Sequence, residues 1–463
     1  MYISKFFGTK SFYKRLLAIM VPILVQNAIT SFISLLDNVM VGLVGTEQMS
    51  GVSIVNQLIF VFNLCIFGTI SGAGLFGAQF FGKGDHEGVR HTFRFKLYVS
   101  VAICVMAIVL FITCGEPLIS LYLHDGSETG DLVLTLKYAK QYLAIMLIGL
   151  LPFTVTQVYS GTLREVGQTV PPMVAGIAGV LTNLAFNYVL IFGKLGAPAL
   201  GVQGAAIATV ISRFVECVAV IVWAHTHKEK CEFIKRVYRS FYVPVALVKA
   251  IVKKGSPLLL NETLWAAAQA TLLQCYSVRG IAVVSALNIS NTIFNTFSVL
   301  FLAVGSAIAL MLGHILGTGD TEGAKDAARK MITFSFGMGL CCGILVAICA
   351  PFFPHIYNTT DEVRELATML TLVIACAAPI HAYINASYFT MRSGGKTVTV
   401  FMFDSVYAWG VNVLLAFVLV NFTSLPIVLV YVCCQGIDIV KAILGTVLVA
   451  KGSWAVDLTK KIN

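Results

Sequence analysis

Two acidic residues lie in apolar stretches of this chain with no basic residue within one helical turn of them. Asp37 occurs in the segment LLDNVMVG, and Glu262 occurs in the segment PLLLNETLW. An ionisable side chain at the centre of a bilayer costs at least about 2.5–3.5 kcal/mol, so it needs a function or a partner. Asp37 is a candidate to exchange a proton near neutral pH, or to hold a sodium ion beside amide and hydroxyl oxygens. The alternative for Asp37 is a structural hydrogen bond near the outer membrane surface.

Glu262 is a candidate for ion coupling or for substrate binding. Trp265 follows it by one helical turn, and its ring is suited to stacking on a flat or cationic solute. Amide side chains recur at helical spacing elsewhere, which predicts faces that line a wet cavity or bond to neighbouring helices. They are Asn288, Asn291 and Asn295 in one stretch, and Asn183 and Asn187 in another. Both roles remain open for each of these amides.

Three other acidic residues in apolar stretches have simpler explanations. Asp404 is expected near the cytoplasmic start of its span, where water reaches it. The other two each have a basic residue three positions away, and such a pair on one helix face neutralises itself. These pairs are Glu216 with Arg213 and Asp438 with Lys441.

The sequence lacks the common motifs for nucleotide, zinc or nucleophile chemistry. It contains no G-x-x-x-x-G-K-S/T loop, no H-E-x-x-H, no G-x-S-x-G and no Cys/His set with metal-ligand spacing. We therefore expect no enzyme activity, no cofactor, and no metal beyond a sodium ion at Asp37. Energy for uphill transport would then come from a proton or sodium gradient.

The composition predicts the elements that carry these side chains. Of 463 residues, 58% are hydrophobic and 12% are charged, whereas a soluble domain carries about 25% charged residues. Apolar stretches of about 20 residues, long enough to cross a bilayer, recur from end to end. We predict an all-α polytopic membrane protein with twelve transmembrane helices at 16–43, 52–80, 94–114, 133–158, 170–192, 203–226, 256–278, 284–312, 329–350, 366–391, 399–420 and 425–450.

The two halves of the chain repeat each other at an offset of 235 residues. Pro22 then matches Pro257, and the segment GKGDHEG at 82–88 matches GTGDTEG at 317–323 without a gap. Repeats in the same direction are common in transporters and place the binding site between the halves near mid-membrane. We predict an N-terminal six-helix lobe at 1–227, a basic cytoplasmic linker at 228–254 and a C-terminal six-helix lobe at 255–463. Pro22 and Pro257 are predicted to kink matching helices and are candidate hinges.

The repeated glycine and aspartate segments are predicted to be tight turns whose acidic residues start the next helix. In the same alignment Gln26 matches Asn261, while Glu262 matches Asn27 and Asp37 matches Leu272. Each half therefore has one unpaired acid at a different depth, which indicates that the halves have diverged in role.

The net charge of +10 is concentrated in alternate loops, which argues against a nucleic-acid partner. By the positive-inside rule this pattern predicts that both termini are cytoplasmic and that the protein lies in the cytoplasmic (plasma) membrane. Contact with anionic membrane lipids is a secondary interpretation of the same clusters. The largest cluster is the linker, in which 236–254 is a candidate surface helix interrupted by Pro244. Other clusters are read as loops after the second, eighth and tenth spans: Lys83, Arg90, Arg94, Lys96, Lys325, Arg329, Lys330, Arg392 and Lys396.

Three segments resemble the multidrug and toxic compound extrusion (MATE) family of cation-coupled antiporters, and the resemblance covers nearly the whole chain. The segments are Pro22…Gln26…Asp37-x-x-Met40-Val41-Gly42, Gly161-Thr162-Leu163-Arg164-x-x-Gly167, and Gly201-x-x-Gly204-Ala205-Ala206-x-Ala208-Thr209. The resemblance implies two six-helix bundles forming a V around a central cavity.

The same resemblance implies that Asp37 is the proton or sodium site, surrounded by Asn183, Asn187 and Thr209. It also places the span-seven glutamate of some members on Glu262. Those members carry a further acid on span ten, where this chain reads HAYIN at 381–385, so coupling through Asp37 is favoured. His381 in that segment either titrates or packs.

The resulting prediction is a monomeric antiporter that exports small organic, cationic drugs or metabolites in exchange for H+ or Na+ by alternating access. The first alternative is a flippase for lipid-linked precursors in the same superfamily, which would favour a basic cavity and extra spans. The second is a receptor or channel, and a channel would show filter loops or rings of like charge. The candidate cavity residues are instead acidic or amide side chains.

Overall fold

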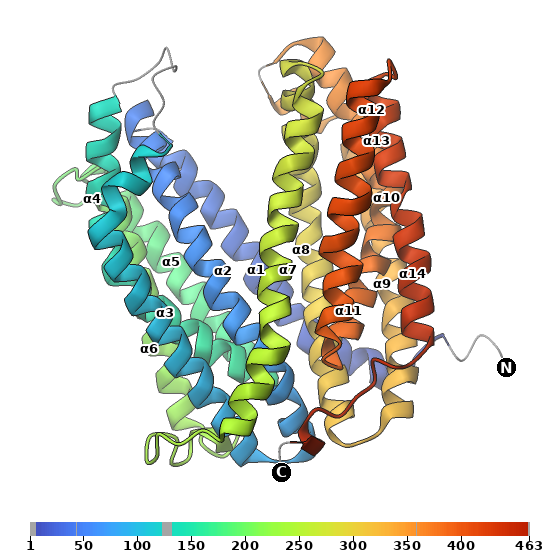
Figure 1. Cartoon of the computed structure of the whole chain (residues 1–463). Coiled ribbons are helices and arrows are strands. Elements are labelled where there is room, and N and C mark those ends of the chain that lie inside the picture. The colour runs from blue at the N-terminus through green and yellow to red at the C-terminus, as the bar shows by residue number, and fades with distance from the viewer. Residues whose placement is uncertain (1–5, 43, 123–131, 358, 462–463) are drawn as a thin grey trace. The chain divides into compact units, whose positions relative to one another are not determined.

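The computed structural model describes residues 6–42, 44–122, 132–357 and 359–461, and this part of the chain is built from helices and turns (Figure 1). The first half contains α1 (Lys10–Gly42), α2 (Thr46–Lys83), α3 (His86–Ser120), α4 (Leu132–Glu165), α5 (Val170–Phe192) and α6 (Val202–Thr226). The second half begins with α7 (Val245–Ser277), α8 (Ile281–Gly317), α9 (Thr321–Cys349) and α10 (Asp361–Ser393).

The last two predicted spans are each built from several shorter helices. The first contains α11 (Thr397–Phe401), the π-helical segments η4 (Met402–Val406) and η5 (Ala408–Val413), and α12 (Leu414–Phe422). The second contains α13 (Ile427–Gly436) and α14 (Asp438–Ala450). Short 3-10 turns lie at η2 (Glu232–Ile234), η3 (Phe353–Ile356) and η6 (Thr459–Lys461).

Eleven stretches of the described chain are long and apolar enough to cross a membrane. The twelfth long helix, α7, is 33 residues long but carries lysines in its first turns and Asn261 and Glu262 in its middle. At about 1.5 Å per residue α7 is also long enough to span. The predicted twelve-helix, all-α fold is confirmed.

The described chain forms two compact units. The N-terminal unit contains residues 25–77 and 85–249, and the C-terminal unit contains residues up to 24, 78–84 and 250–463. Helices α1, α2 and α7 therefore each pass from one unit into the other. In α1 this change falls between Leu24 and Val25, two residues after Pro22. The lobe boundaries at 227 and 255 stay a prediction.

The repeated glycine and aspartate segments form matching turns, as predicted. Gly84 and Gly319 have φ angles of +78° and +85°, which favour glycine. The following aspartates cap the next helices, because Asp85 accepts a hydrogen bond from the Gly88 amide at 2.8 Å and Asp320 from the Gly323 amide at 2.7 Å. The repeat therefore extends from the sequence to the capping geometry.

One predicted loop is part of a helix. Because α3 begins at His86, Arg94 and Lys96 lie inside it, and Lys96 is fully buried. The Lys96 ammonium donates to the two carboxylate oxygens of Glu165 at 2.7 and 2.9 Å and to Thr162 Oγ1 at 2.7 Å. A Cβ atom on Gly77 would lie 2.1 Å from Glu165 Oε2. The assignment of Lys96 to a topology-setting loop was wrong, since it holds α3 against α4 beside a glycine surface of α2.

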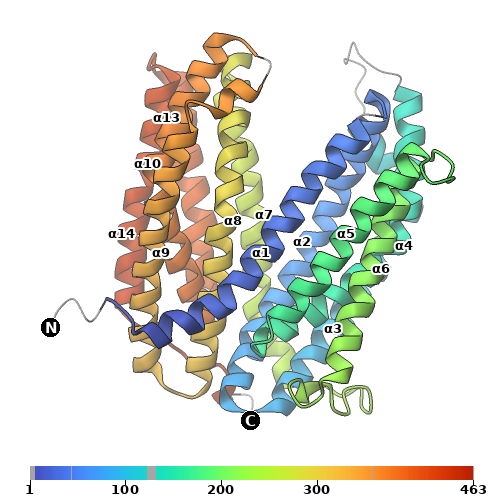
Figure 2. The same ribbon diagram turned by 180° about the vertical axis from the view of Figure 1, so that it is seen from behind.

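The core of each unit is apolar. In the N-terminal unit it is formed where α2, α4 and α6 meet, with Val55, Met146 and Ala206 at its centre. In the C-terminal unit it is formed mainly by α8, α10 and the last helices, with Leu287, Leu370 and Val430 almost fully buried. Figure 2 shows these helices from behind. Polar side chains inside such a bundle must find partners within it.

Candidate functional site

Asp37 lies in a cluster of amide and hydroxyl groups inside the N-terminal unit. Asn187 Nδ2 donates to Asp37 Oδ1 at 2.5 Å and to Asn183 Oδ1 at 3.0 Å. Asn183 and Asn187 are four residues apart on α5, so both side chains point toward α1, and both are buried. Asn183 Nδ2 also donates to Thr209 Oγ1 on α6 at 3.2 Å. The structure thus brings the four predicted residues of the Asp37 site together.

The Asn183 amide makes different contacts in its two orientations. In one orientation its oxygen faces the Asp37 carboxyl group. In the other its nitrogen donates to Asp37 Oδ1 at 2.8 Å and Oδ2 at 3.2 Å, while its oxygen accepts from Thr209 Oγ1 at 3.2 Å. An ionised carboxylate only accepts hydrogen bonds, whereas a protonated one also donates. The site therefore has a hydrogen-bonding arrangement for both protonation states of Asp37.

The cluster also has the ligands that a small hard cation requires. Asn187 Oδ1 is buried and has no hydrogen-bond partner in the described part of the chain. It stands beside the Asp37 carboxylate, the Asn183 carbonyl group and the Thr209 hydroxyl group, and such oxygens bind hard cations. Within the described residues, no basic side chain pairs with Asp37. The residues present fit a proton or a sodium ion.

Glu262 has a basic partner, which corrects the prediction that it is unpaired. Arg392 Nη1 lies 3.4 Å from Glu262 Oε1, and the Tyr388 hydroxyl group donates to the same oxygen at 3.1 Å. Arg392 is 5% exposed and lies inside α10, not in the loop assigned to it from the sequence. Arg392 also donates to Tyr388 Oη at 3.2 Å. Glu262 is therefore paired with the charge of Arg392 and hydrogen-bonded to Tyr388, both on α10.

The repeat contained a signal for this pair. The segment Thr162-Leu163-Arg164 matches Thr390-Met391-Arg392 once a small deletion is allowed in the second half. Arg164 Nη2 donates to Gln26 Oε1 at 2.5 Å in the N-terminal unit. Gln26 matches Asn261, the residue before Glu262. In each half, the same arginine of the fourth helix therefore reaches the same turn of the first helix.

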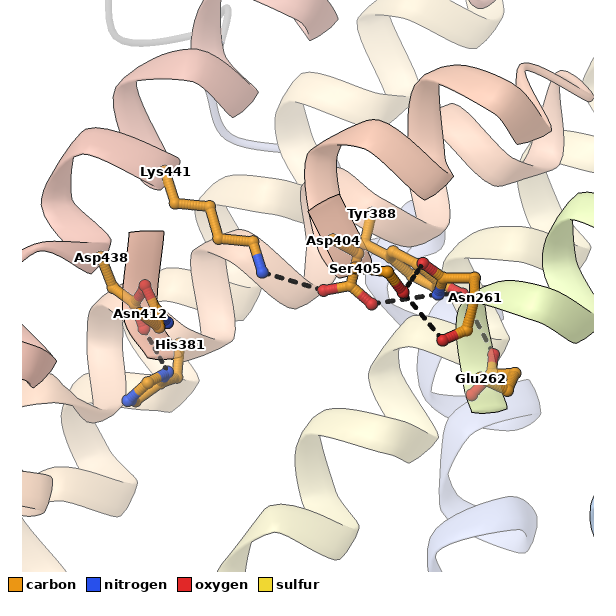
Figure 3. A network of polar contacts seen from close by, with 9 residues as sticks. All are labelled: Asn261, Glu262, His381, Tyr388, Asp404, Ser405, Asn412, Asp438 and Lys441. Carbon is orange, nitrogen blue, oxygen red and sulfur yellow. Dashed lines mark hydrogen bonds and ion pairs between the residues drawn. The ribbon is translucent and has the colours of Figure 1, made fainter. Parts of the chain in front are cut away.

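The two i,i+3 ion pairs predicted from the sequence are not formed. Lys441 pairs with Asp404, with Nζ 2.8 Å from Oδ1, and not with Asp438 (Figure 3). Asp438 instead accepts from Asn412 Nδ2 at 3.1 Å and lies 3.8 Å from His381 Nδ1. In the described chain, Arg213 forms no ion pair with Glu216 and donates to the Gly149 carbonyl group at 3.3 Å.

Asp404 belongs to a buried network and is not solvated as predicted. Its side chain is 16% exposed, and Asn261 Nδ2 donates to its Oδ2 at 3.0 Å. Ser405 Oγ donates to Asn261 Oδ1 at 2.7 Å, and Asn261 Nδ2 lies 3.4 Å from Tyr388 Oη. Figure 3 shows the resulting chain of contacts from Lys441 through Asp404 and Asn261 to Tyr388 and Glu262. Asp404 and Ser405 lie in the π-helical segment η4, a rare geometry that is frequent at functional sites.

Within the described residues, no side-chain hydrogen bond or ion pair joins the remaining predicted residues to this network. Trp265 is 43% exposed. Asn288 is exposed and Asn291 is half-buried, and neither makes a side-chain hydrogen bond in the described residues. Pro22 and Pro257 lie inside continuous helices, α1 and α7. Substrate contact for the first three and hinge motion at the prolines stay predictions.

The repeated helical halves, the apolar spans and the buried polar sites define a multi-pass membrane transport protein. The MatE family model matches residues 22–189 and 257–418, more than half of the chain. This chain therefore belongs to the MatE family, as its sequence predicted.

Several relatives carry names that describe drug resistance. A probable multidrug resistance protein NorM of Thermotoga maritima is 22% identical over 444 residues, which cover 95% of this chain and 93% of that protein. A probable NorM of Halalkalibacterium halodurans is 26% identical over 427 residues, which cover 89% and 88%. A solved structure of a variant of the Vibrio cholerae MATE transporter VcmN has a TM-score of 0.85 at 15% identity and covers 95% of this chain and 97% of that one. That structure shares the fold.

Proposed function

We propose that this protein is a secondary active antiporter that exports organic cations, drugs or metabolites, across the cytoplasmic membrane in exchange for H+ or Na+. The observation that carries the proposal is the Asp37 site, a carboxyl group held by Asn187 and Asn183 with no basic partner in the described chain. A buried carboxylate without a fixed cation requires a mobile one. A proton, a sodium ion and an organic cation all satisfy that requirement.

The site lets these cations exclude one another. When Asp37 is ionised, the Asn183 amide nitrogen faces it, and the site carries a negative charge that attracts an organic cation. When a proton binds Asp37, the carboxyl group donates to Asn183 Oδ1 and this charge disappears. A sodium ion has the same effect on the charge while using the carbonyl oxygens of Asn183 and Asn187. Binding of the coupling ion therefore weakens binding of the substrate, which is the requirement for exchange.

Alternating access supplies the second requirement. Expulsion of a cationic substrate on one side follows if the ion-bound and substrate-bound forms prefer different openings. The change of unit within α1, two residues after Pro22, is a suitable place for a bend that responds to Asp37 on the same helix.

Glu262 has a different role in this proposal. Because Arg392 already neutralises it, Glu262 lacks the free charge that would bind a coupling ion. Coupling is therefore assigned to Asp37, and Glu262 keeps its helix in register with α10. The names of the relatives support the drug-export part of the proposal.

The test is efflux of a fluorescent organic cation from proteoliposomes, with proton and sodium gradients imposed separately. Wild type should export under at least one gradient, and Asp37→Asn should lose this gradient-driven efflux. Glu87→Gln, which removes an exposed acid in the same unit, should behave as wild type. Normal efflux by Asp37→Asn would overturn the assignment of Asp37. Lack of efflux by wild type for a panel of organic cations would overturn the substrate class.

A further inference from the structure

The segment 227–244 between α6 and α7, called the basic loop below, is fixed to the N-terminal unit by one buried arginine. Arg94 on α3 donates from Nε to the Val237 carbonyl group at 2.8 Å and from its two terminal nitrogens to the Arg236 and Tyr242 carbonyl groups, both at 3.2 Å. Arg90, one turn earlier, donates to the Phe233 carbonyl group at 3.3 Å. The loop is therefore wrapped around guanidinium groups of α3, and its backbone has a defined shape.

The basic loop separates its apolar residues from its charged ones. Cys231, Phe233, Ile234 and Val237 are all at most 3% exposed. The expected surface helix at 236–254 forms only from Val245 onward, so the residues before it adopt this anchored loop. The apolar residues of the loop pack against the N-terminal unit, for example Phe233 against Phe93 of α3, and the charged side chains face outward.

Most outward-facing residues of the basic loop are cationic or aromatic, although Glu229 and Ser240 are also exposed. Five basic residues stand against two acidic ones in it, and no acidic residue follows Glu232 until Glu262. Glu232 is shared by Lys235 and His86, each at 3.4 Å. The remaining basic residues are all exposed and form no ion pair within the described part of the chain: Lys228, Lys230, Arg236 and Arg239.

Three aromatic side chains of the basic loop are exposed, and Phe241 and Tyr242 are more exposed than Tyr238. Phe241 is 80% exposed and Tyr242 is 63% exposed, which is unusual for such large apolar surfaces in contact with water. The Tyr242 backbone is held in place, since its carbonyl group accepts from Arg94 Nη1 and lies 3.2 Å from His91 Nδ1 on α3. Cationic side chains and exposed aromatic rings at the end of a membrane span are typical of segments that lie at the membrane interface.

The position of the loop matches this composition. It starts directly after the apolar helix α6 ends at Thr226, and it lies beyond the end of α6 beside the first turns of α3 (Figure 1). Arg90 and Arg94 lie in the first turns of α3. Because these turns precede the apolar part of α3, we expect the exposed cations and rings at the level where lipid headgroups begin.

We propose that the basic loop is a binding site for anionic phospholipid headgroups. Arg236, Arg239, Lys228 and Lys230 bind the lipid phosphates, and Phe241 with Tyr242 inserts among the headgroups. Only the carbonyl group of Arg236 is used by Arg94, so its guanidinium group remains available for phosphate. Each basic residue near an anionic surface strengthens binding by about fivefold.

The experiment is lipid retention by the full-length purified protein, measured by native mass spectrometry during titration with phosphatidylglycerol or phosphatidylcholine. Wild type should prefer phosphatidylglycerol, and this preference should fall as salt is raised. Each single variant should lose about fivefold in phosphatidylglycerol retention, and the double variant R236Q/R239Q should lose about 25-fold. The charge-preserving variant R236K/R239K should keep most of the retention.

The control removes two exposed lysines outside the loop, K137Q/K194Q, and should bind phosphatidylglycerol as wild type does. Phe241→Ser should weaken retention of both lipids, because it removes apolar contact and leaves the charge. Equal retention by wild type and R236Q/R239Q would overturn the proposal. Competition by inorganic phosphate at the same concentration as the lipid would also overturn it, since the site would then bind a soluble anion.

Discussion

Lys441 Nζ lies 2.8 Å from Asp404 Oδ1, and this ion pair leaves Asp438 to Asn412 and His381. The lysine is therefore used to join α14 to the π-helical segment η4, not to neutralise the acid one turn before it. Both partners are largely buried, with side-chain exposures of 8% and 16%. The polar interior of the C-terminal unit is organised by contacts between helices.

A double-mutant cycle distinguishes the two pairings of Lys441. The cycle of Lys441→Met with Asp404→Asn should give an interaction energy of about 1–3 kcal/mol, because the two groups are in contact. The cycle of Lys441→Met with Asp438→Asn should give a value within about 0.5 kcal/mol of zero. Unfolding in mixed micelles supplies the free energies. A larger coupling for Asp438 than for Asp404 would show that the pairing is the one expected from the sequence.

Removal of Arg392 should destabilise the C-terminal unit because it leaves the half-buried Glu262 without its cation. Arg392→Gln is expected to lower the free energy of unfolding by about 3–5 kcal/mol. The double variant R392Q/E262Q should recover part of this loss, since a neutral amide then faces a neutral amide. The single variant E262Q should be milder than R392Q, because Tyr388 remains as a partner of Arg392. Equal stability of R392Q and wild type would contradict the buried ion pair.

The Lys96 pair offers a matched test in the N-terminal unit. Lys96→Met leaves Glu165 without its fully buried cation and should cost about 3–5 kcal/mol of stability. Gly77→Ala should also be destabilising, because its Cβ atom would approach Glu165 Oε2 to 2.1 Å. Gly337→Ala is the control, since a Cβ atom there meets no atom within 4 Å. Thermal unfolding of the three variants is the measurement, and Lys96→Met and Gly77→Ala should both unfold at a lower temperature than Gly337→Ala.

The amides around Asp37 should set the affinity for the coupling ion. Asn187→Ala removes the donor to Asp37 and the free carbonyl oxygen, so half-maximal efflux should require about tenfold more coupling ion. Thr182→Ala, on the same helix with its hydroxyl group bonded to the Ala178 carbonyl group, is the matched control. Concentration series of H+ and Na+ in proteoliposomes measure the effect. An unchanged ion requirement in Asn187→Ala would separate this residue from the ion site.

Burial in the basic loop raises the pKa of the Cys231 thiol to about 11. The thiol should therefore react slowly with maleimide near pH 8 while the protein is folded, since the thiolate is the reactive form. A variant that keeps only Cys231 should be labelled far more slowly than a variant whose single thiol comes from the substitution Ser240→Cys at an exposed position. Equal labelling rates would show that the loop is not anchored as described.

The same shift has a consequence for stability. The pKa of the Cys231 thiol is near 9.0 in the unfolded chain and about 11 in the folded chain. At a pH between these two pKa values, the folded chain binds more protons at Cys231 than the unfolded chain does. Stability should therefore fall as the pH rises through this range. Cys231→Ala should remove that part of the alkaline loss, as measured by unfolding at pH 8 and pH 10.

Local patterns predicted the helices, the turns and part of the site. The caps at Asp85 and Asp320 follow from residue type and spacing alone, because a cap depends on the next three residues. The contact of Asn183 and Asn187 with Asp37 needed the four-residue spacing and the family resemblance together. Their spacing fixes a shared helix face, but it does not say which helix that face meets.

Partners from distant helices were not predictable in the same way. Glu262 and Arg392 are 130 residues apart, so no local pattern joins them. The pairing of Asp438 with Lys441 considered only their own helix, whereas Lys441 pairs with Asp404 on the π-helical segment η4. Lys96 was placed in a loop because a lysine next to an apolar stretch looks like the end of a membrane span. The helix α3 in fact begins ten residues earlier, at His86, so Lys96 lies inside it.

The matching arginines of the two halves also bear on how the chain evolved. A duplicated ancestral half would have carried one arginine that reached the first helix of its own half. In the present chain Arg164 meets the neutral amide of Gln26, while Arg392 meets the carboxylate of Glu262. One scaffold thus tolerates two acceptors of different charge. Exchange of the acceptor alone offers a route by which one copy gains or loses a charge while the contact between its helices is inherited unchanged.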